Sequence, residues 1–153
     1  MCCSKYQFTT RHDAVTAWLT NTLRQCHMRV ENEVAVEGKK RPADVLITRW
    51  SNGGPLAIDV TVTHPLAPGL GLNAQASKDV LLQKERNKIK KNLPICQRAH
   101  LSFVPFPLTT FGELSPVATK LSCLLKWWTC TPRCMAKTPP LSAINSTRAS
   151  NLP

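Results

Sequence analysis

Two aspartates, placed in successive predicted strands, are the residues of this sequence best suited to chemistry. Asp44 stands near the start of a predicted strand over 43–50, and Asp59 lies in the middle of a predicted strand over 56–64. The Asn/Gly-rich segment 51–55 between them favours a tight turn, so the two strands should pair as a hairpin. The midpoint between positions 44 and 59 falls at the start of this turn. The two residues should therefore lie almost opposite each other, with Cβ atoms roughly 4.5–5.5 Å apart.

Two carboxylates at that separation repel each other unless a cation lies between them. Mg²⁺ prefers oxygen ligands and commonly uses one or two protein carboxylates together with water and a substrate phosphate. Such a site can activate water and neutralise charge on a phosphate. Each aspartate alone also has a structural interpretation, with Asp44 capping the chain after Pro42 and Asp59 pairing with a Lys or Arg at a sheet edge. Only five acidic residues follow Glu37, and this scarcity favours the metal site when the two are taken together.

A predicted helix over 73–92 carries the cations that could complete this site. Lys84 and Lys88 share one helical face with Ser77, Val80 and Leu81, the face that should pack toward the sheet. A lysine on such a face commonly extends its ammonium group to the surface, which is the alternative to a role in the site. A cation near a reacting phosphate would stabilise the charge that develops there.

Hydrophobic periodicity places these residues in a single α/β domain. The expected order is helix, three strands, helix, strand, followed by a C-terminal helix, and it implies a mixed sheet of about four strands flanked by helices. Proline should end the second helix at Pro94 and the last strand before Pro105. The domain is expected over 11–128, with an N-terminal remnant over 1–10 and a disordered tail over 129–153. The remaining elements are a helix over 11–26 and strands over 28–36 and 99–104, with the last helix over 114–128.

The overall charge favours a polyanionic partner. Twenty Lys and Arg residues against nine Asp and Glu give a formal charge of +11, and a basic surface gains affinity for nucleic acid by displacing counterions from phosphates. No apolar run is long enough to span a membrane, and the N-terminus lacks the apolar core of a signal peptide. Seven irregularly spaced cysteines argue for reduced thiols. We therefore expect an intracellular protein, and the alternative to DNA binding is an interaction module whose charge serves solubility.

Three segments together resemble a known family. They are Arg41-Pro42-Ala43-Asp44, the strand Ile58-Asp59-Val60-Thr61-Val62 and the helical run Lys84-Glu85-Arg86-Asn87-Lys88. In this order and spacing they are similar to the restriction-like endonuclease domain of site-specific non-LTR retrotransposons, a member of the PD-(D/E)xK superfamily. Arg11-His12-Asp13 also looks like the start of that domain, and the resemblance extends over about 11–126. It implies a truncated fragment, because the accompanying reverse transcriptase lies outside this sequence.

The resemblance implies a restriction-endonuclease-like fold and a nuclear, metal-dependent DNA endonuclease. Asp44 and Asp59 would hold Mg²⁺ or Mn²⁺. Lys84 would be the catalytic lysine displaced onto the following helix, with Lys88 as the second choice. The alternative function is a catalytically inactive nucleic-acid-binding remnant of the same fold.

Two positions depart from the family pattern. Thr61 stands where a lysine would complete the (D/E)xK triplet, and the first helix offers only Asp13 where many members place an acidic ligand. Glu33 on the first strand is a possible substitute for that acid. The residues expected to contact nucleic acid are Arg41, Lys88 and Lys91.

Overall fold

The structure is a computed structural model that describes residues 5–33, 35–36, 41–50, 54–64 and 74–130. Its sheet has the strand order β1-β2-β3-β4, in which β1, β2 and β3 pair antiparallel and β4 pairs parallel to β3. This confirms the predicted α/β class, the mixed four-stranded sheet and the additional C-terminal helix. The elements are α1 (Lys5–Gln25), β1 (Val30–Asn32), β2 (Val45–Ile47), β3 (Leu56–Thr63), α2 (Ala74–Arg98), β4 (Ser102–Thr109) and α3 (Pro116–Cys130).

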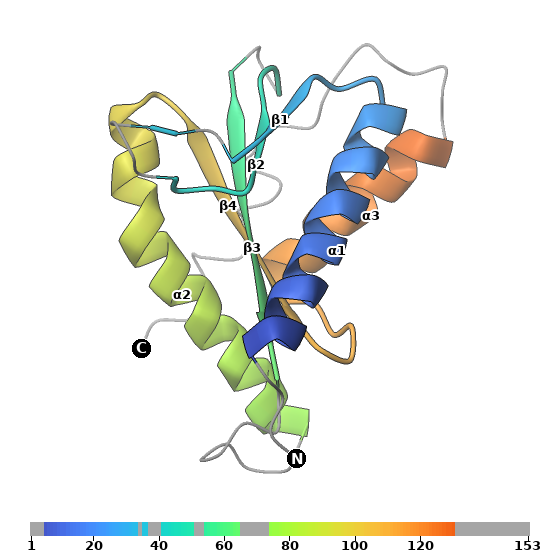
Figure 1. Ribbon diagram of the computed structural model, residues 1–153, viewed down its shortest axis with the longest axis vertical. Coiled ribbons are helices and arrows are strands. Elements are labelled where there is room, and N and C mark those ends of the chain that lie inside the picture. The colour runs from blue at the N-terminus through green and yellow to red at the C-terminus, as the bar shows by residue number, and fades with distance from the viewer. Residues whose placement is uncertain (1–4, 34, 37–40, 51–53, 65–73, 131–153) are drawn as a thin grey trace, which may run out of the picture.

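Helices cover both faces of the sheet, as Figure 1 shows, with α2 on one side and α1 with α3 on the other. Alternate residues of the central strand β3 therefore enter two different cores. Ile58 and Val60 pack with residues of α1 and α3, whereas Ala57 packs with Cys96 of α2. Because successive side chains of a strand point to opposite faces, Asp59 shares the face of Ala57 and lies beneath α2.

The register of the β2–β3 hairpin is the one predicted from the turn. Val45 pairs with Ile58, and the Asp44 amide donates a hydrogen bond of 3.0 Å to the Ile58 carbonyl. On the other side, the Asp44 carbonyl accepts a hydrogen bond of 2.9 Å from the Glu33 amide. Asp44 is thus tied through its backbone to two neighbouring chain segments, directly before β2 and next to Asp59.

The prediction that the last strand ends before its prolines is wrong. β4 continues through Pro105 and Pro107 to Thr109. The Ser102 amide donates to Pro55, directly before β3, and the Thr110 amide, directly after β4, donates to Thr63 of β3. The even-numbered residues of β4 therefore point their amides toward β3, and both proline nitrogens face the opposite, outer edge. A proline costs no ladder hydrogen bond there, because an edge strand needs no donor on its outer side.

The prediction that Pro94 ends the second helix is also wrong, because α2 continues to Arg98 with Pro94 inside it. Proline removes the hydrogen bond to the carbonyl of Lys90, and its ring crowds that carbonyl. Pro94 and Lys90 are both exposed, so water can reach the freed group. The extra turn buries Cys96 completely against the sheet, and its carbonyl accepts a 2.8 Å bond from the Leu101 amide.

Other boundaries differ less. α1 begins at Lys5 rather than at Arg11, and β1 spans three residues because Glu33 turns the chain with a φ of +50°. The predicted disordered tail falls outside the described residues from position 131 onward, as do the first four residues of the predicted remnant. Within the described part of the chain, no helix is long and apolar enough to cross a membrane.

Candidate active site

The Asp44 carboxylate bridges α1 and the edge of β3. Its Oδ2 accepts a hydrogen bond of 2.7 Å from the Val60 amide and lies 3.2 Å from His12 Nε2 of α1. β2 begins only at Val45, so beyond this point β3 has no strand partner on that side and the Val60 amide would otherwise be unpaired. The other oxygen, Oδ1, makes no hydrogen bond with the described residues. One carboxylate oxygen is thus held twice, and the second stays available for a ligand.

Asp59 is a buried carboxylate held by α2. Its side chain is 8% exposed, and Lys88 Nζ approaches Oδ1 to 3.1 Å and Oδ2 to 2.9 Å. Asn92 Nδ2, one turn further along α2, donates to Oδ2 at 3.3 Å. Burial raises the pKa of Asp59 above its usual value, and the Lys88 ammonium opposes that shift. Such an acid requires a partner to remain charged, and Lys88 provides it.

The two aspartates are neighbours on paired segments, and each carboxylate contacts a different helix. Asp44 binds His12 of α1, whereas Asp59 binds Lys88 and Asn92 of α2. Asp44 was expected within a strand over 43–50, but β2 spans only Val45–Ile47 and Asp44 directly precedes it. Asp44 precedes β2, so its side chain can turn to the open edge of β3. The two charges remain coupled, because the negative charge of Asp44 raises the pKa of Asp59.

His12 introduces a positive charge at this edge. Its Nδ1 lies 3.2 Å from Asp13 Oδ1, and its Nε2 faces Asp44, so both ring nitrogens point at carboxylate oxygens. The hydrogen bond to Asp44 raises the pKa of His12 to about 9, although partial burial works against this rise. At neutral pH His12 is an imidazolium that donates to both acids. Its charge in turn lowers the pKa of Asp59.

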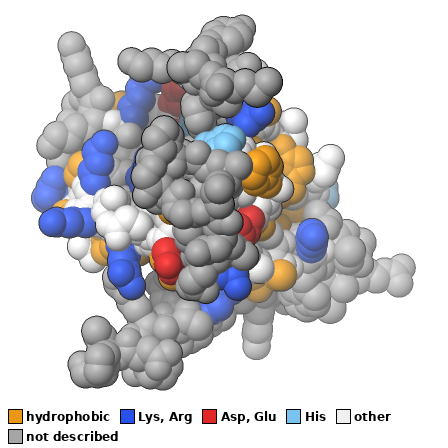
Figure 2. All heavy atoms as spheres, turned by 90° about the horizontal axis from the view of Figure 1, so that it is seen from below, with side chains coloured by type: hydrophobic (Ala, Val, Ile, Leu, Met, Phe, Trp, Pro, Cys, Tyr) orange, Lys and Arg blue, Asp and Glu red, His pale blue; other side chains and the backbone are white. Residues whose placement is uncertain are grey.

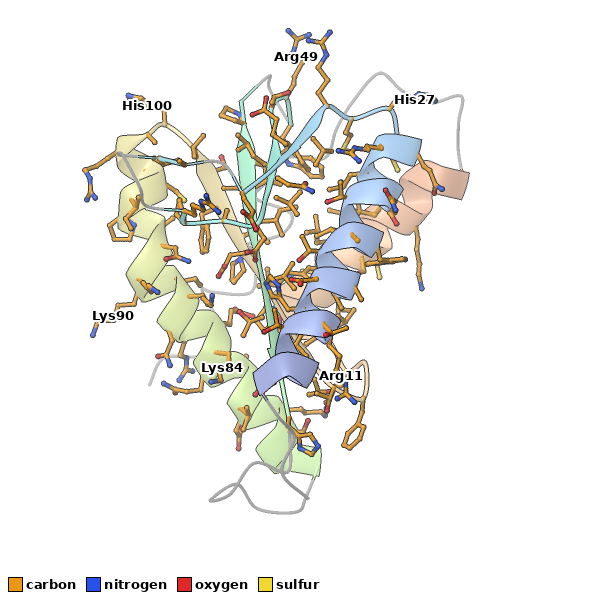
Figure 3. All side chains as sticks on the ribbon, viewed as in Figure 1. Arg11, His27, Arg49, Lys84, Lys90 and His100 are labelled. Atoms are coloured by element: carbon orange, nitrogen blue, oxygen red, sulfur yellow. The ribbon has the colours of Figure 1, made fainter. Side chains whose placement is uncertain are left out.

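Of the two lysines considered for the site, Lys88 makes the contact with Asp59. Lys84 lies one turn earlier on the surface of α2 and is exposed (Figure 3). Lys91 is likewise exposed, one turn beyond Lys88. Ser77, Val80 and Leu81 are buried as the predicted stripe requires, but Lys84 is exposed, and Lys88 is the lysine of the stripe that contacts Asp59.

The remaining predicted residues lie around this centre. Glu33 forms an exposed ion pair with Arg41 instead of pointing its carboxylate at the two aspartates. Thr61 shares the α2-facing side of β3 with Asp59, and its hydroxyl is buried without a hydrogen-bond partner among the described residues. A lysine at this position would have to share the space beneath α2 with Lys88.

Two members of the site were given no role from the sequence, His12 and Asn92. Asn92 does carry a signal, because a buried amide on the sheet-facing side of a helix must have a polar partner. In the sequence, His12 stands out only as part of Arg11-His12-Asp13 at the expected start of the domain. Its contact with Asp44 joins residues 32 positions apart, and no local pattern predicts it.

The carboxylate chemistry of this centre fits a hard divalent cation. Among the described residues, no three His, Cys, Asp or Glu side chains converge as a ready-made ligand set. Mg²⁺ does not need such a set, because one or two carboxylates suffice when water and a substrate phosphate complete the octahedron. Asp44 would supply Oδ1, and Asp59 would supply an oxygen released from its contacts with α2.

Exposed cationic side chains lie along α2, the helix that contacts Asp59. Figure 2 shows Lys and Arg side chains gathered at the left of the view, over α2. Lys90 points away from the sheet, and Arg11 lies on α1 across β3 (Figure 3). The exposed basic residues of α2 are Lys78, Lys84, Arg86, Lys90, Lys91 and Arg98.

Comparison of the chain with known protein families, with curated proteins and with solved structures finds no match.

Proposed function

We propose that this chain is a metal-dependent DNA endonuclease domain of the restriction-like, PD-(D/E)xK kind found in site-specific non-LTR retrotransposons. The observation that carries the proposal is the juxtaposition of Asp44 and Asp59 on paired segments, with Lys88 of α2 on the Asp59 carboxylate. The element order supports it, because helices flank a mixed sheet whose two central strands bring the acids together. A restriction-endonuclease-like fold is part of the proposal.

Asp44 and Asp59 would hold Mg²⁺ or Mn²⁺, which when bound supplies a Lewis acid for water activation and for charge on the scissile phosphate. Lys88 then has two tasks. It neutralises the buried Asp59, and its ammonium would donate to an oxygen of a phosphate bound beside Asp59. This assignment moves the catalytic lysine from Lys84, the first choice from the sequence, to Lys88.

The DNA backbone would run along the exposed basic side of α2. Lys91 lies one turn beyond Lys88 and would contact phosphates, while Arg41 at the far side of Asp44 would do the same after releasing Glu33. Contacts of this kind provide affinity without reading the sequence. A nuclear location follows from the proposed substrate.

A second candidate function is a nucleic-acid-binding remnant that has lost hydrolysis. It is favoured by Asp59, whose two oxygens are both occupied by α2 side chains, and by Thr61 at the usual lysine position. In this reading Lys88 permanently replaces the cation instead of assisting it.

Plasmid nicking separates the two candidates. Purified protein is incubated with supercoiled DNA and Mg²⁺, next to the Asp44→Asn and Asp59→Asn variants and an EDTA control. Nicking that depends on both aspartates and on metal supports the endonuclease. Nicking that survives Asp59→Asn rejects the proposed site. Salt-dependent DNA retention without cleavage assigns the chain to the second candidate.

A further inference from the structure

The Asp44 carboxylate is a ligand that must be oriented by its surroundings. Its backbone is held by hydrogen bonds to Ile58 and Glu33. Because Asp44 precedes β2, its side chain is not packed between the side chains of a regular strand. A carboxylate held by one hydrogen bond can still swing about that contact. Metal ligands are typically held by a second hydrogen-bonding partner, and loss of such partners weakens metal binding by about 10- to 100-fold.

Two donors from different elements meet on one oxygen of Asp44. The Val60 amide comes from β3 and His12 Nε2 comes from α1, at 2.7 and 3.2 Å. Because both bonds end on Oδ2, the rotation of the carboxylate is fixed and Oδ1 is the oxygen left to face a cation. Any residue at position 60 other than proline would supply the backbone amide. His12 is therefore the one donor to Asp44 that depends on the identity of a side chain.

His12 is itself held in place. It is part of α1, its side chain is 32% exposed, and its Nδ1 is hydrogen-bonded to Asp13, the next residue of the helix. The imidazole therefore presents Nε2 to Asp44 in one orientation. This double anchoring is typical of a ring that positions another group.

We propose that His12 is a positioning residue of the metal site, which fixes Asp44 through Oδ2 so that Oδ1 is presented to the divalent cation. The inference rests on the proposed function, in which Asp44 is a ligand of the divalent cation. His12 does not touch the cation or the substrate in this role. A positive charge so near the site also repels a cation, and the test has to separate this repulsion from the hydrogen bond.

Two uncharged variants provide that separation. His12→Gln places an amide N–H close to the position of Nε2, whereas His12→Phe keeps a ring of similar shape without a donor. Mn²⁺ binding is measured without DNA, by the spin-resonance signal of the free ion, at one pH and ionic strength. Arg11→Gln, which removes a neighbouring exposed charge on α1, is the matched control, and circular dichroism verifies folding.

We expect His12→Phe to bind Mn²⁺ about tenfold more weakly than His12→Gln, and Arg11→Gln to bind like the unsubstituted chain. If the unsubstituted chain binds Mn²⁺ and Asp44→Asn abolishes that binding, equal Mn²⁺ affinity of the Gln and Phe variants overturns the positioning role. Mn²⁺ binding that is missing from the unsubstituted chain, or unaffected by Asp44→Asn, instead overturns the proposed metal site and the positioning role with it.

Discussion

Replacement of Lys88 by methionine should destabilise the fold, because it leaves the Asp59 charge buried with one neutral donor. The Asp59 side chain is 8% exposed and that of Lys88 29%, with a closest approach of 2.9 Å. Removing one partner of a buried ion pair costs about 3–5 kcal/mol. Water still reaches the Lys88 ammonium and screens the pair, so we expect a cost below this range, about 2–3 kcal/mol, at pH 7. For a chain of this size that loss lowers Tm by roughly 6–9 °C.

The assay is urea unfolding followed by circular dichroism, in a double-mutant cycle. Lys88→Met is compared with Asp59→Asn and with the double variant, which removes both charges and should lie within about 1 kcal/mol of the unsubstituted chain. Lys84→Met, one exposed turn earlier on α2, is the matched control and should change stability by less than about 0.5 kcal/mol.

The destabilisation caused by Lys88→Met should depend on pH in a defined direction. Burial raises the pKa of Asp59 above its value of 3.8 in an unfolded chain, so protonation of this acid favours the folded state. The penalty of Lys88→Met should therefore be largest at neutral pH and should shrink as the pH falls through the raised pKa of Asp59. The reasoning is refuted if Lys88→Met is as stable as the unsubstituted chain at pH 7, or if its penalty grows in acid.

Three further outcomes are expected. In plasmid nicking with Mg²⁺, Lys88→Met should lower the rate at least about 100-fold and Lys84→Met by less than about threefold, since only the former reaches the buried carboxylate. Asn92→Leu should cost about 1–2 kcal/mol in urea unfolding by removing a buried donor to Asp59, and an unchanged midpoint would contradict that contact. The stability difference between the metal-free chain and His12→Phe should be fully present below pH 6.5 and disappear as the pH rises through about 9, because the pKa of His12 is raised in the folded state. Tm values of both proteins measured at several pH values between about 6 and 10 check whether the difference shrinks as the pH rises.

Local sequence patterns sufficed for much of the fold. The Asn/Gly-rich turn at 51–55 and the alternation after it gave the correct hairpin register, because strand pairing on either side of a tight turn has few alternatives. Proline was misleading twice, at Pro94 and in β4. Its cost depends on whether the missing amide would have had a partner, and that is a property of the neighbouring elements rather than of the segment itself.

The sequence by itself determined that two scarce acids would lie side by side on paired segments, since register follows from chain distance to the turn. It also determined that Lys84 and Lys88 share one stripe of a helix. Only the tertiary structure decided that Lys88 meets Asp59, because the position of α2 along the sheet depends on how its apolar residues pack. It likewise decided that Asp44 turns to His12. Contacts between elements arise from the packing of whole helices and strands, and such long-range geometry leaves no trace in the spacing of neighbouring residues.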